Sequence, residues 1–539
     1  MPLAAAIAVY AIVAGAASTS QHEAAKTGKT LKASSDSQDK VAQSKEEVAY
    51  LEAKLHKERH AFSKMGENNY ATFQVETEES SFFNAVLANG DVNGDGFDDI
   101  LVNEPFWNNC RGRSFLFLGA KEVDFSLPEL ILYGDKGEDY FGDYNGFYAD
   151  INNDGYDDII LGARGYGSKD GLGDGRVYIY YSGPNMDNTP DVVLDGEEGQ
   201  RSAFGIAVGA GDINNDGYAD IVVGAQMHEQ GRGRVYLHWG GEAVDTTADL
   251  TFEGEGYPGG KPVIGHGGLM VQGWFGRRVD ASGDVNGDGY DDILIGARHA
   301  GGKNYNGCAY LFFGNKREEM DSICDYAFRG EDAFGQMGAS LALFDLDNDG
   351  FSDVIVGARF ARSHRGTVNI WWGGENFDGN RPADIVLEGE PGSTMGADTI
   401  ACGDFNSDGY GDVLAGAGSY PRYPVSYGRG YVFYGNSKNL MDTDCDYIID
   451  PEEPTIWFGL GGASAGDVNN DGYVDALISS EGRGDCNGRA FLYLGPFATK
   501  DLSGKIKAQQ EVVKEIEQEL SGARQKLENA RKFVPSNPQ

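Results

Sequence analysis

The chain contains little cysteine and little positive charge. Only six of its 539 residues are cysteines, and no two of them form a C-x-x-C pair. This argues against a disulfide-dense scaffold and against a structural zinc site. Lysine and arginine number 44 against 84 aspartates and glutamates, so the formal net charge is −40. Such a balance argues against nucleic acid as a partner, because its phosphates would be repelled.

Long apolar runs are scarce as well. The one extended stretch lies within residues 1–20 and runs from Pro2 to Ala17. It is too short to span a bilayer comfortably and ends in small residues, as a secretory signal does, although no Lys or Arg precedes it. We expect a signal peptide, or else a short apolar anchor that attaches the chain to a membrane. Either predicts a secreted or cell-surface protein. Residues 21–40 are polar and are expected to form a disordered linker.

Sequence motifs of common catalytic sites are missing. The chain has no G-x-S-x-G and no H-E-x-x-H segment, and its eight histidines are scattered. We therefore predict that the protein is not an enzyme.

Glycine and aspartate are abundant and lie in a repeat. The pattern D-x-[ND]-x-D-G-[YF]-x-D occurs seven times, at intervals of about sixty residues. An FG-like segment such as SAFGIAV precedes each copy, and an apolar run ending in Gly-Ala, such as DIVVGAQ, follows it. Alternating aromatic runs such as GRVYIYYSG come next and are typical of strands. Four strands in each of seven units predict an all-β fold, a seven-bladed β-propeller.

The acidic loops are typical of calcium sites. Oxygen ligands at positions 1, 3, 5 and 9, a backbone carbonyl at position 7 and a glycine reversal at position 6 suit Ca²⁺. An EF-hand would need glutamate at position 12, which is apolar in every copy, so that reading is excluded. We predict up to seven Ca²⁺ ions. The predicted ligands, with position 7 acting through its carbonyl, are Asp91, Asn93, Asp95, Phe97, Asp99, Asp150, Asn152, Asp154, Tyr156, Asp158, Asp212, Asn214, Asp216, Tyr218, Asp220, Asp284, Asn286, Asp288, Tyr290, Asp292, Asp345, Asp347, Asp349, Phe351, Asp353, Asp404, Asn406, Asp408, Tyr410, Asp412, Asp467, Asn469, Asp471, Tyr473 and Asp475.

The phenylalanine-glycine and glycine-alanine signatures around these loops resemble the FG-GAP repeats of integrin α-subunit propellers and of related secreted microbial proteins. The resemblance covers about residues 70–496. It implies a calcium-stabilised propeller with an extracellular binding or adhesion role. One departure is that all seven units carry the metal loop, whereas integrin members of the family usually metallate only some blades.

The ends of the repeat region predict how the ring closes. The seventh unit has a third strand at Gly488–Gly495 but no fourth, and Tyr70–Glu76 lies where other units have their fourth strand. We expect Tyr70–Glu76 to complete a propeller that spans residues 70–497. Residues 41–66 and 502–534 carry apolar residues at seven-residue spacing, which is typical of coiled coils. We expect N- and C-terminal helices that form an antiparallel coiled-coil stalk open to self-association, with two separate amphipathic helices as the alternative.

The segments after each Gly-Ala are expected on the face opposite the metal loops. Arginines and aromatic residues gather there, which favours a glycan or protein ligand. The candidate ligand-binding residues are Trp107, Tyr166, Arg298, Arg359, Tyr420 and Tyr423. Alternatively, each arginine pairs with a neighbouring acid and the aromatic rings cap the blades.

These observations favour an extracellular, calcium-stabilised binding or adhesion module for a glycan or protein. A structural subunit of an extracellular assembly or filament is the alternative. A polysaccharide lyase-type enzyme is a further one, because some calcium propellers that resemble this one belong to that class.

Overall fold

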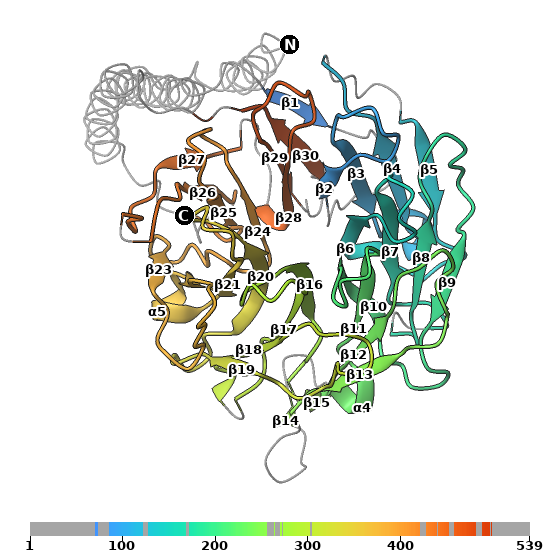
Figure 1. The fold of residues 1–539 in the computed structure, drawn as a ribbon, viewed down its shortest axis with the longest axis horizontal. Helices are drawn as coiled ribbons and strands as arrows, with labels where there is room; N and C mark the ends of the chain where they lie inside the picture. Colours follow the sequence, from blue (N-terminus) through green and yellow to red (C-terminus); the bar gives the residue numbers. More distant parts are fainter. Residues whose placement is uncertain are drawn as a thin grey trace, which may run out of the picture. The chain divides into compact units, whose positions relative to one another are not determined.

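Seven four-stranded antiparallel sheets are arranged in a ring in the described part of the chain (Figure 1). The structure is a computed structural model and describes residues 70–73, 86–121, 128–168, 172–255, 263–264, 270–271, 273–301, 304–420, 427–438, 440–451, 457–480, 488–495 and 497. Among these residues, no helix is long and apolar enough to cross a membrane. The all-β, seven-bladed β-propeller predicted from the repeats is confirmed.

Six of the blades are each built from four consecutive strands, and the first strand lies nearest the centre of the ring (Figure 1). The strands of blades 1 to 3 are β2 (Val86–Gly90), β3 (Asp99–Glu104), β4 (Arg113–Phe117) and β5 (Leu130–Tyr133); β6 (Phe141–Ala149), β7 (Asp158–Ala163), β8 (Arg176–Tyr180) and β9 (Val192–Asp195); and β10 (Phe204–Gly211), β11 (Asp220–Ala225), β12 (Arg234–His238) and β13 (Leu250–Glu253). Those of blades 4 to 6 are β16 (Arg278–Gly283), β17 (Asp292–Ala297), β18 (Cys308–Phe312) and β19 (Tyr326–Arg329); β20 (Met337–Phe344), β21 (Asp353–Ala358), β22 (Thr367–Trp371) and β23 (Ile385–Glu388); and β24 (Ile400–Gly403), β25 (Asp412–Gly416), β26 (Gly430–Phe433) and β27 (Tyr447–Ile449).

Blade 7 combines the two ends of the repeat region. Its strands are β28 (Phe458–Gly466), β29 (Asp475–Ser480), β30 (Arg489–Tyr493) and, at the outer edge, β1 (Tyr70–Phe73). β1 runs antiparallel to β30, with Tyr70 opposite Tyr493. The prediction that this segment fastens the ring is therefore confirmed. The predicted stalk helices, residues 41–66 and 502–534, lie outside the described residues.

Short elements connect or extend the blades. The small hairpin of β14 (Val263–Ile264) and β15 (Met270–Val271) lies in the insertion before blade 4. The tight turns α3 (Trp107–Cys110), α4 (His228–Gly231) and α5 (Ala361–His364) join the second and third strands of blades 1, 3 and 5. Each contains three consecutive residues with positive φ, so these are turns rather than regular helices.

The burial of each strand follows its place in the blade. The second strands, such as β7, β11 and β17, are buried along their whole length, because each lies between two neighbours in its sheet and between two neighbouring blades. Their sequences are accordingly continuous apolar runs. The fourth strands are only partly buried, as expected at the rim.

Paired glycines explain the FG and Gly-Ala signatures. A Cβ atom on Gly162, in the Gly-Ala segment of blade 2, would lie 1.9 Å from the carbonyl oxygen of Gly205 in the FG segment of blade 3. In the same way, a Cβ atom on Gly224 would lie 2.0 Å from the carbonyl oxygen of Gly276 in the next blade. Gly205 and Gly276 also have φ of +80°. Side chains are thus excluded on both partners, and the repeated motif is the contact by which adjacent blades touch.

Candidate metal loops and the opposite face

The first aspartate of each acidic loop organises the backbone that follows it. Asp91 accepts hydrogen bonds from the amides of Gly94 at 2.7 Å, Asp95 at 3.1 Å and Gly96 at 2.8 Å. The bond from the glycine amide at position 6 recurs in all seven loops, at 2.8 to 2.9 Å. The loops therefore share one backbone conformation, wrapped around the carboxylate at position 1.

Two residues in each loop adopt left-handed backbone angles. The glycine at position 6 was expected to do so, and its φ lies between +85° and +91°. Position 4 does so as well, which the sequence analysis missed. Its occupants, with φ between +50° and +76°, are Gly94, Asn153, Asn215, Gly287, Asn348, Ser407 and Asn470. The signal was present in the sequence, because glycine and asparagine are the residues that tolerate this conformation best.

The aspartate at position 9 is buried where the second strand begins. Asp99 is fully buried, and its carboxylate accepts the amides of Val92 at 2.9 Å and Gly119 at 2.8 Å. Burial raises the pKa of Asp99 to about 7 and that of Asp353 to about 8, despite these hydrogen bonds. A nearby cation would favour the ionised forms.

The loop of blade 5 brings its carboxylates closest together. Oxygens of Asp345, Asp347 and Asp353 all lie within 4.8 Å of one another. Burial raises the pKa of Asp347 to about 6, against the opposing charge of Lys438. The Lys438 ammonium lies 2.5 Å from Asp349 and 3.8 Å from Asp347. Hard oxygens at this density fit a Ca²⁺ ion, which would supply the counter-charge that the aspartates need. The ligand assignments in all seven loops remain predictions.

Each loop is also joined to the following blade. The Asp91 amide donates to the Asp157 carboxylate at 2.9 Å, and the Asp157 amide donates back to the Asp91 carbonyl at 3.1 Å. The same pair closes the ring between blades 7 and 1: the Asp467 amide donates to Asp98 at 2.6 Å, and the Asp98 amide donates to the Asp467 carbonyl at 3.2 Å. Ordering a loop therefore also orders the contact between two blades.

The predicted ligand-binding aromatic residues lie against arginines of their own blades. Arg113 lies 4.7 Å from the ring of Trp107, Arg176 lies 3.6 Å from that of Tyr166, and Arg429 lies 4.4 Å from that of Tyr420. These three arginines also pair with acids. Arg429, for example, contacts Asp450 at 2.6 Å and Glu390 at 2.9 Å. Tyr423 lies outside the described residues. The role of these aromatic residues in ligand binding stays a prediction.

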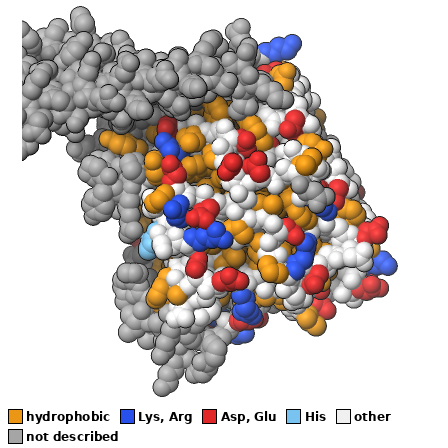
Figure 2. Space-filling model, turned by 90° about the vertical axis from the view of Figure 1, so that its left-hand side faces the viewer, with side chains coloured by type: hydrophobic (Ala, Val, Ile, Leu, Met, Phe, Trp, Pro, Cys, Tyr) orange, Lys and Arg blue, Asp and Glu red, His pale blue; other side chains and the backbone are white. Residues whose placement is uncertain are grey.

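Acidic and basic side chains are interleaved over the described surface of the flank shown in Figure 2. Ion pairs of blade 5, such as Arg362 with Glu388 at 2.6 Å and Arg381 with Asp384, fit this mixture. Exposed pairs of this kind contribute little to stability, about 0 to 1 kcal/mol each.

The other two predicted ligand-binding residues, Arg298 and Arg359, meet at one buried carboxylate. Asp398 lies 3.1 Å from Arg298, 3.3 Å from Arg359, 3.6 Å from Arg278 and 4.0 Å from Arg277. We call these four arginines the arginine cluster. Burial alone would raise the pKa of Asp398, but the charges of the cluster hold that pKa below its usual value.

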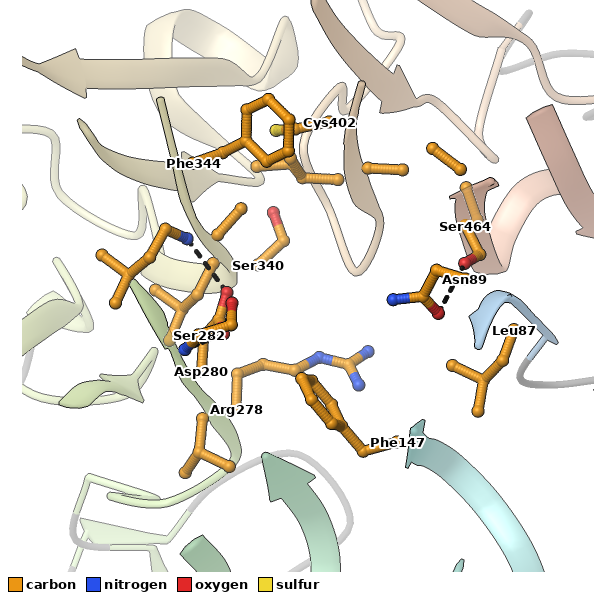
Figure 3. Close-up of a pocket in the computed structure, with 18 of the residues that line it drawn as sticks. Leu87, Asn89, Phe147, Arg278, Asp280, Ser282, Ser340, Phe344, Cys402 and Ser464 are labelled. Carbon is orange, nitrogen blue, oxygen red and sulfur yellow. Dashed lines mark hydrogen bonds between the residues drawn. The ribbon is translucent and has the colours of Figure 1, made fainter. Parts of the chain in front are cut away.

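The arginine cluster adjoins a cavity of about 880 Å³ enclosed by the first strands of the blades. Arg278 and Asp398 line one end of the cavity, and the metal-loop residues Asp291, Asp345 and Asn348 line the other. Figure 3 shows the side chain of Arg278 extending toward the centre of the cavity, with its guanidinium beside the ring of Phe147. Two members of the cluster, Arg298 and Arg359, were expected from the sequence, whereas Asp398 and the cavity were not.

Family models agree with the repeat structure. The model described as the FG-GAP repeat matches residues 83–116, 148–180, 204–238 and 275–312, and that of the FG-GAP-like repeat matches residues 345–415. The chain contains FG-GAP repeats. The matches place FG-GAP units in blades 1 to 6, and blade 7 repeats the same loop and strand order.

Known relatives are similar to part of this chain. Integrin alpha-5 of Xenopus laevis is 30% identical over 227 residues, which is 41% of this chain and 20% of the relative. Integrin alpha-IIb of Mus musculus is 36% identical over 156 residues, 27% of this chain and 15% of the relative. Phosphatidylinositol-glycan-specific phospholipase D of Bos taurus is 30% identical over 194 residues, 34% of this chain and 22% of the relative. The FG-GAP protein therefore spans about a fifth of the length of these relatives.

Proposed function

We propose that this FG-GAP protein is an extracellular ligand-binding module in which Ca²⁺ stabilises the ring and the face opposite the metal loops engages the ligand. The supporting relatives include integrin α-subunits, which match 41% and 27% of this chain. The apolar segment in residues 1–20 fits secretion or surface attachment.

The observation that carries this proposal is the joining of loops to neighbouring blades. The main chain of Asp91 is hydrogen-bonded to Asp157, and that of Asp467 to Asp98, so the metal loops serve the cohesion of the ring. Up to seven Ca²⁺ ions would each neutralise carboxylates in one loop. We therefore assign ligand binding to the opposite face, which carries Trp107, Tyr166 and the arginine cluster.

Binding measurements test the proposal. The full chain would be applied, in calcium and in EDTA, to a glycan array and to a panel of immobilised extracellular matrix proteins. We expect a calcium-dependent signal that Trp107→Ala weakens at least tenfold. Leu440→Ala is the matched control, because Leu440 is an exposed apolar residue in the connection between the third and fourth strands of blade 6, outside the metal loops. Absence of any signal in calcium, or equal loss in both variants, would contradict a binding role for the opposite face.

The alternative of a structural subunit predicts polymers that grow with protein concentration and require residues 502–534. An enzymatic role also has a specific observation behind it, since one relative bears the name of a phospholipase. The match, however, covers only 22% of that relative. We therefore favour a protein without catalytic activity, and turnover of an acidic polysaccharide or of a phosphatidylinositol glycan would contradict that.

A further inference from the structure

We propose that Arg317 and Lys438 compete with Ca²⁺ and thereby lower the calcium affinity of the metal loops of blades 3 and 5. The ring then has two classes of calcium site, five tight and two weak. This rests on the proposed function, in which Ca²⁺ stabilises the ring, and it specifies how two of the loops respond to the calcium concentration.

The two basic side chains hold the same place in their blades. Arg317 lies in the connection between β18 and β19 of blade 4, and Lys438 lies in that between β26 and β27 of blade 6. Each is the third residue after a glycine, Gly314 or Gly435, whose amide donates to the position-9 aspartate of its own blade. An asparagine follows the glycine in both blades, and its side chain accepts the next amide at 2.9 Å. The two turns are therefore built alike.

The other five blades have no basic residue at this place. Their third residues after the equivalent glycine or, in blade 2, serine are Glu122, Asn185, Ala243, Asn376 and Ala498. Among the described residues, accordingly, only the metal loops of blades 3 and 5 form ion pairs with lysine or arginine. The sequence difference and the contacts thus agree on which two loops are special.

Each basic side chain reaches the metal loop of the preceding blade through the aspartate at position 5. The Arg317 guanidinium lies 2.8 Å from the Oδ2 atom of Asp216. The Lys438 ammonium lies 2.5 Å from the Oδ2 atom of Asp349. Both side chains also donate to the carbonyl oxygen of the glycine that follows the third strand of that preceding blade, at 3.1 and 3.0 Å. One arrangement is therefore repeated in two pairs of blades.

The oxygen in these contacts is the one that the backbone of the loop leaves to a cation. The Oδ1 atom of Asp216 accepts the Tyr218 amide at 3.1 Å, and that of Asp349 accepts the Phe351 amide at 3.1 Å. Position 5 is also a predicted Ca²⁺ ligand. Because a guanidinium or ammonium at Oδ2 repels Ca²⁺, the metal must bind against this charge or displace it. Its affinity for these two loops is lowered in either case.

The donor set of blade 5 fits calcium as well as an ammonium. Its loop is the one with an aspartate, Asp347, at position 3, where the other six loops have asparagine. Asp347 is buried, and its Oδ1 atom has no hydrogen-bond partner among the described residues. A further carboxylate raises the attraction for Ca²⁺, since affinity follows the charge of the ligands. Lys438, 3.8 Å from Asp347, balances that additional charge when calcium is scarce.

The exchange between side chain and metal affects the contacts between blades. At low calcium, the ion pairs join the loop of blade 3 to blade 4 and that of blade 5 to blade 6. At higher calcium, Ca²⁺ takes the carboxylates and the basic side chains are released. The five other loops have no such substitute among the described residues and depend on the metal at lower calcium concentrations.

Equilibrium dialysis of the full chain against a series of free Ca²⁺ concentrations, with bound calcium measured by atomic emission, tests this. We expect the wild type to bind five ions first and two more at concentrations about tenfold higher. Arg317→Gln and Lys438→Gln should each move one ion into the tight class, and the double variant should fill all seven sites together. Lys316→Gln is the matched control, because it removes the same charge from an exposed neighbour of Arg317 and should leave the two classes unchanged.

Thermal melting gives a second readout. In EDTA, Lys438→Gln leaves four aspartates of one loop without the ammonium, so its midpoint should fall below that of the wild type. The rise in midpoint on adding calcium should be larger than in the wild type, whereas a variant that only damages the fold would show no larger rise.

The outcomes separate this inference from the proposed function. Seven equivalent sites in the wild type, or weaker calcium binding in Lys438→Gln, would overturn the competition and leave the calcium-stabilised binding module standing. Unchanged classes in both single variants would do the same. If no calcium binds to the wild type, the stabilising role of Ca²⁺ fails together with this inference.

Discussion

Calcium should stabilise the ring more strongly at pH 8 than at pH 5.5. Asp292 and Asp353 begin the second strands of blades 4 and 5 and are fully buried. Burial raises the pKa of each from the usual 3.8 to about 8 in the metal-free protein. Between pH 4 and pH 8 the unfolded chain has lost these protons, whereas the metal-free folded chain still holds them. The free energy of unfolding of the metal-free protein therefore falls as the pH rises through this window.

The size of the effect follows from the same values. From pH 5.5 to pH 8, each of the two groups should lower the free energy of unfolding by about 3 kcal/mol. Bound Ca²⁺ requires the ionised carboxylate, so its binding releases these protons and is favoured by high pH. Free Ca²⁺ at a hundred times the dissociation constant would add about 2.7 kcal/mol per site.

Thermal melting followed by circular dichroism, in 1 mM calcium and in EDTA at both pH values, measures this. We expect the difference between the calcium and EDTA midpoints to widen at pH 8. The variant Asp353→Asn cannot titrate at this position. In EDTA, its melting midpoint should therefore depend less on pH, by the contribution of Asp353. Identical midpoints with and without calcium would refute a structural role for the metal. A difference between the calcium and EDTA midpoints that is smaller at pH 8 than at pH 5.5 would refute the assignment of this pH dependence to buried aspartates.

Three further changes test other parts of the ring. Asp398→Asn leaves four arginines without their shared carboxylate and should cost about 3–5 kcal/mol in urea unfolding; an unchanged midpoint would show that the cluster is compensated elsewhere. Gly155→Ala would add a Cβ atom that has no heavy atom within 4 Å, but the backbone φ of Gly155 is +90°. The substitution should therefore lower the free energy of unfolding by about 1–2 kcal/mol through the backbone alone, and a melting temperature equal to that of the wild type would contradict this. Deleting residues 70–76 removes the edge partner of β30, so light scattering should show self-association; a monomer with the wild-type midpoint would contradict the closure.

Local repetition made the blades predictable. The strand order, the metal loops and the fourth strand supplied by Tyr70–Glu76 all follow from patterns that recur within one unit, and comparison between units corrects for irregular copies. The EF-hand was excluded in the same way, because position 12 lies inside a buried strand in each copy. The candidate metal ligands likewise come from spacing inside nine residues.

Contacts between blades were not predictable, because no unit contains both partners. Asp398 is separated in sequence by 100 residues from Arg298 and by 39 from Arg359. The reciprocal bonds between Asp98 and Asp467 join residues 369 apart. The residue before each FG segment also escaped prediction. Trp274 and Trp457 adopt φ of +57° and +62° there, although bulky side chains disfavour this conformation, so the fold imposes it.

The pairing of β1 with β30 has a consequence for how the protein is made. β1 is synthesised before all the other strands, yet Tyr70 must find Tyr493 at the far end of the ring. At usual rates of translation, roughly 20 to 80 s would separate the two strands as they leave the ribosome. During that time each finished blade can pack only on the one before it, and two open edges persist. The ring thus acquires its full cooperativity in a single final step, and a nascent chain that stalls before β30 would remain an open arc.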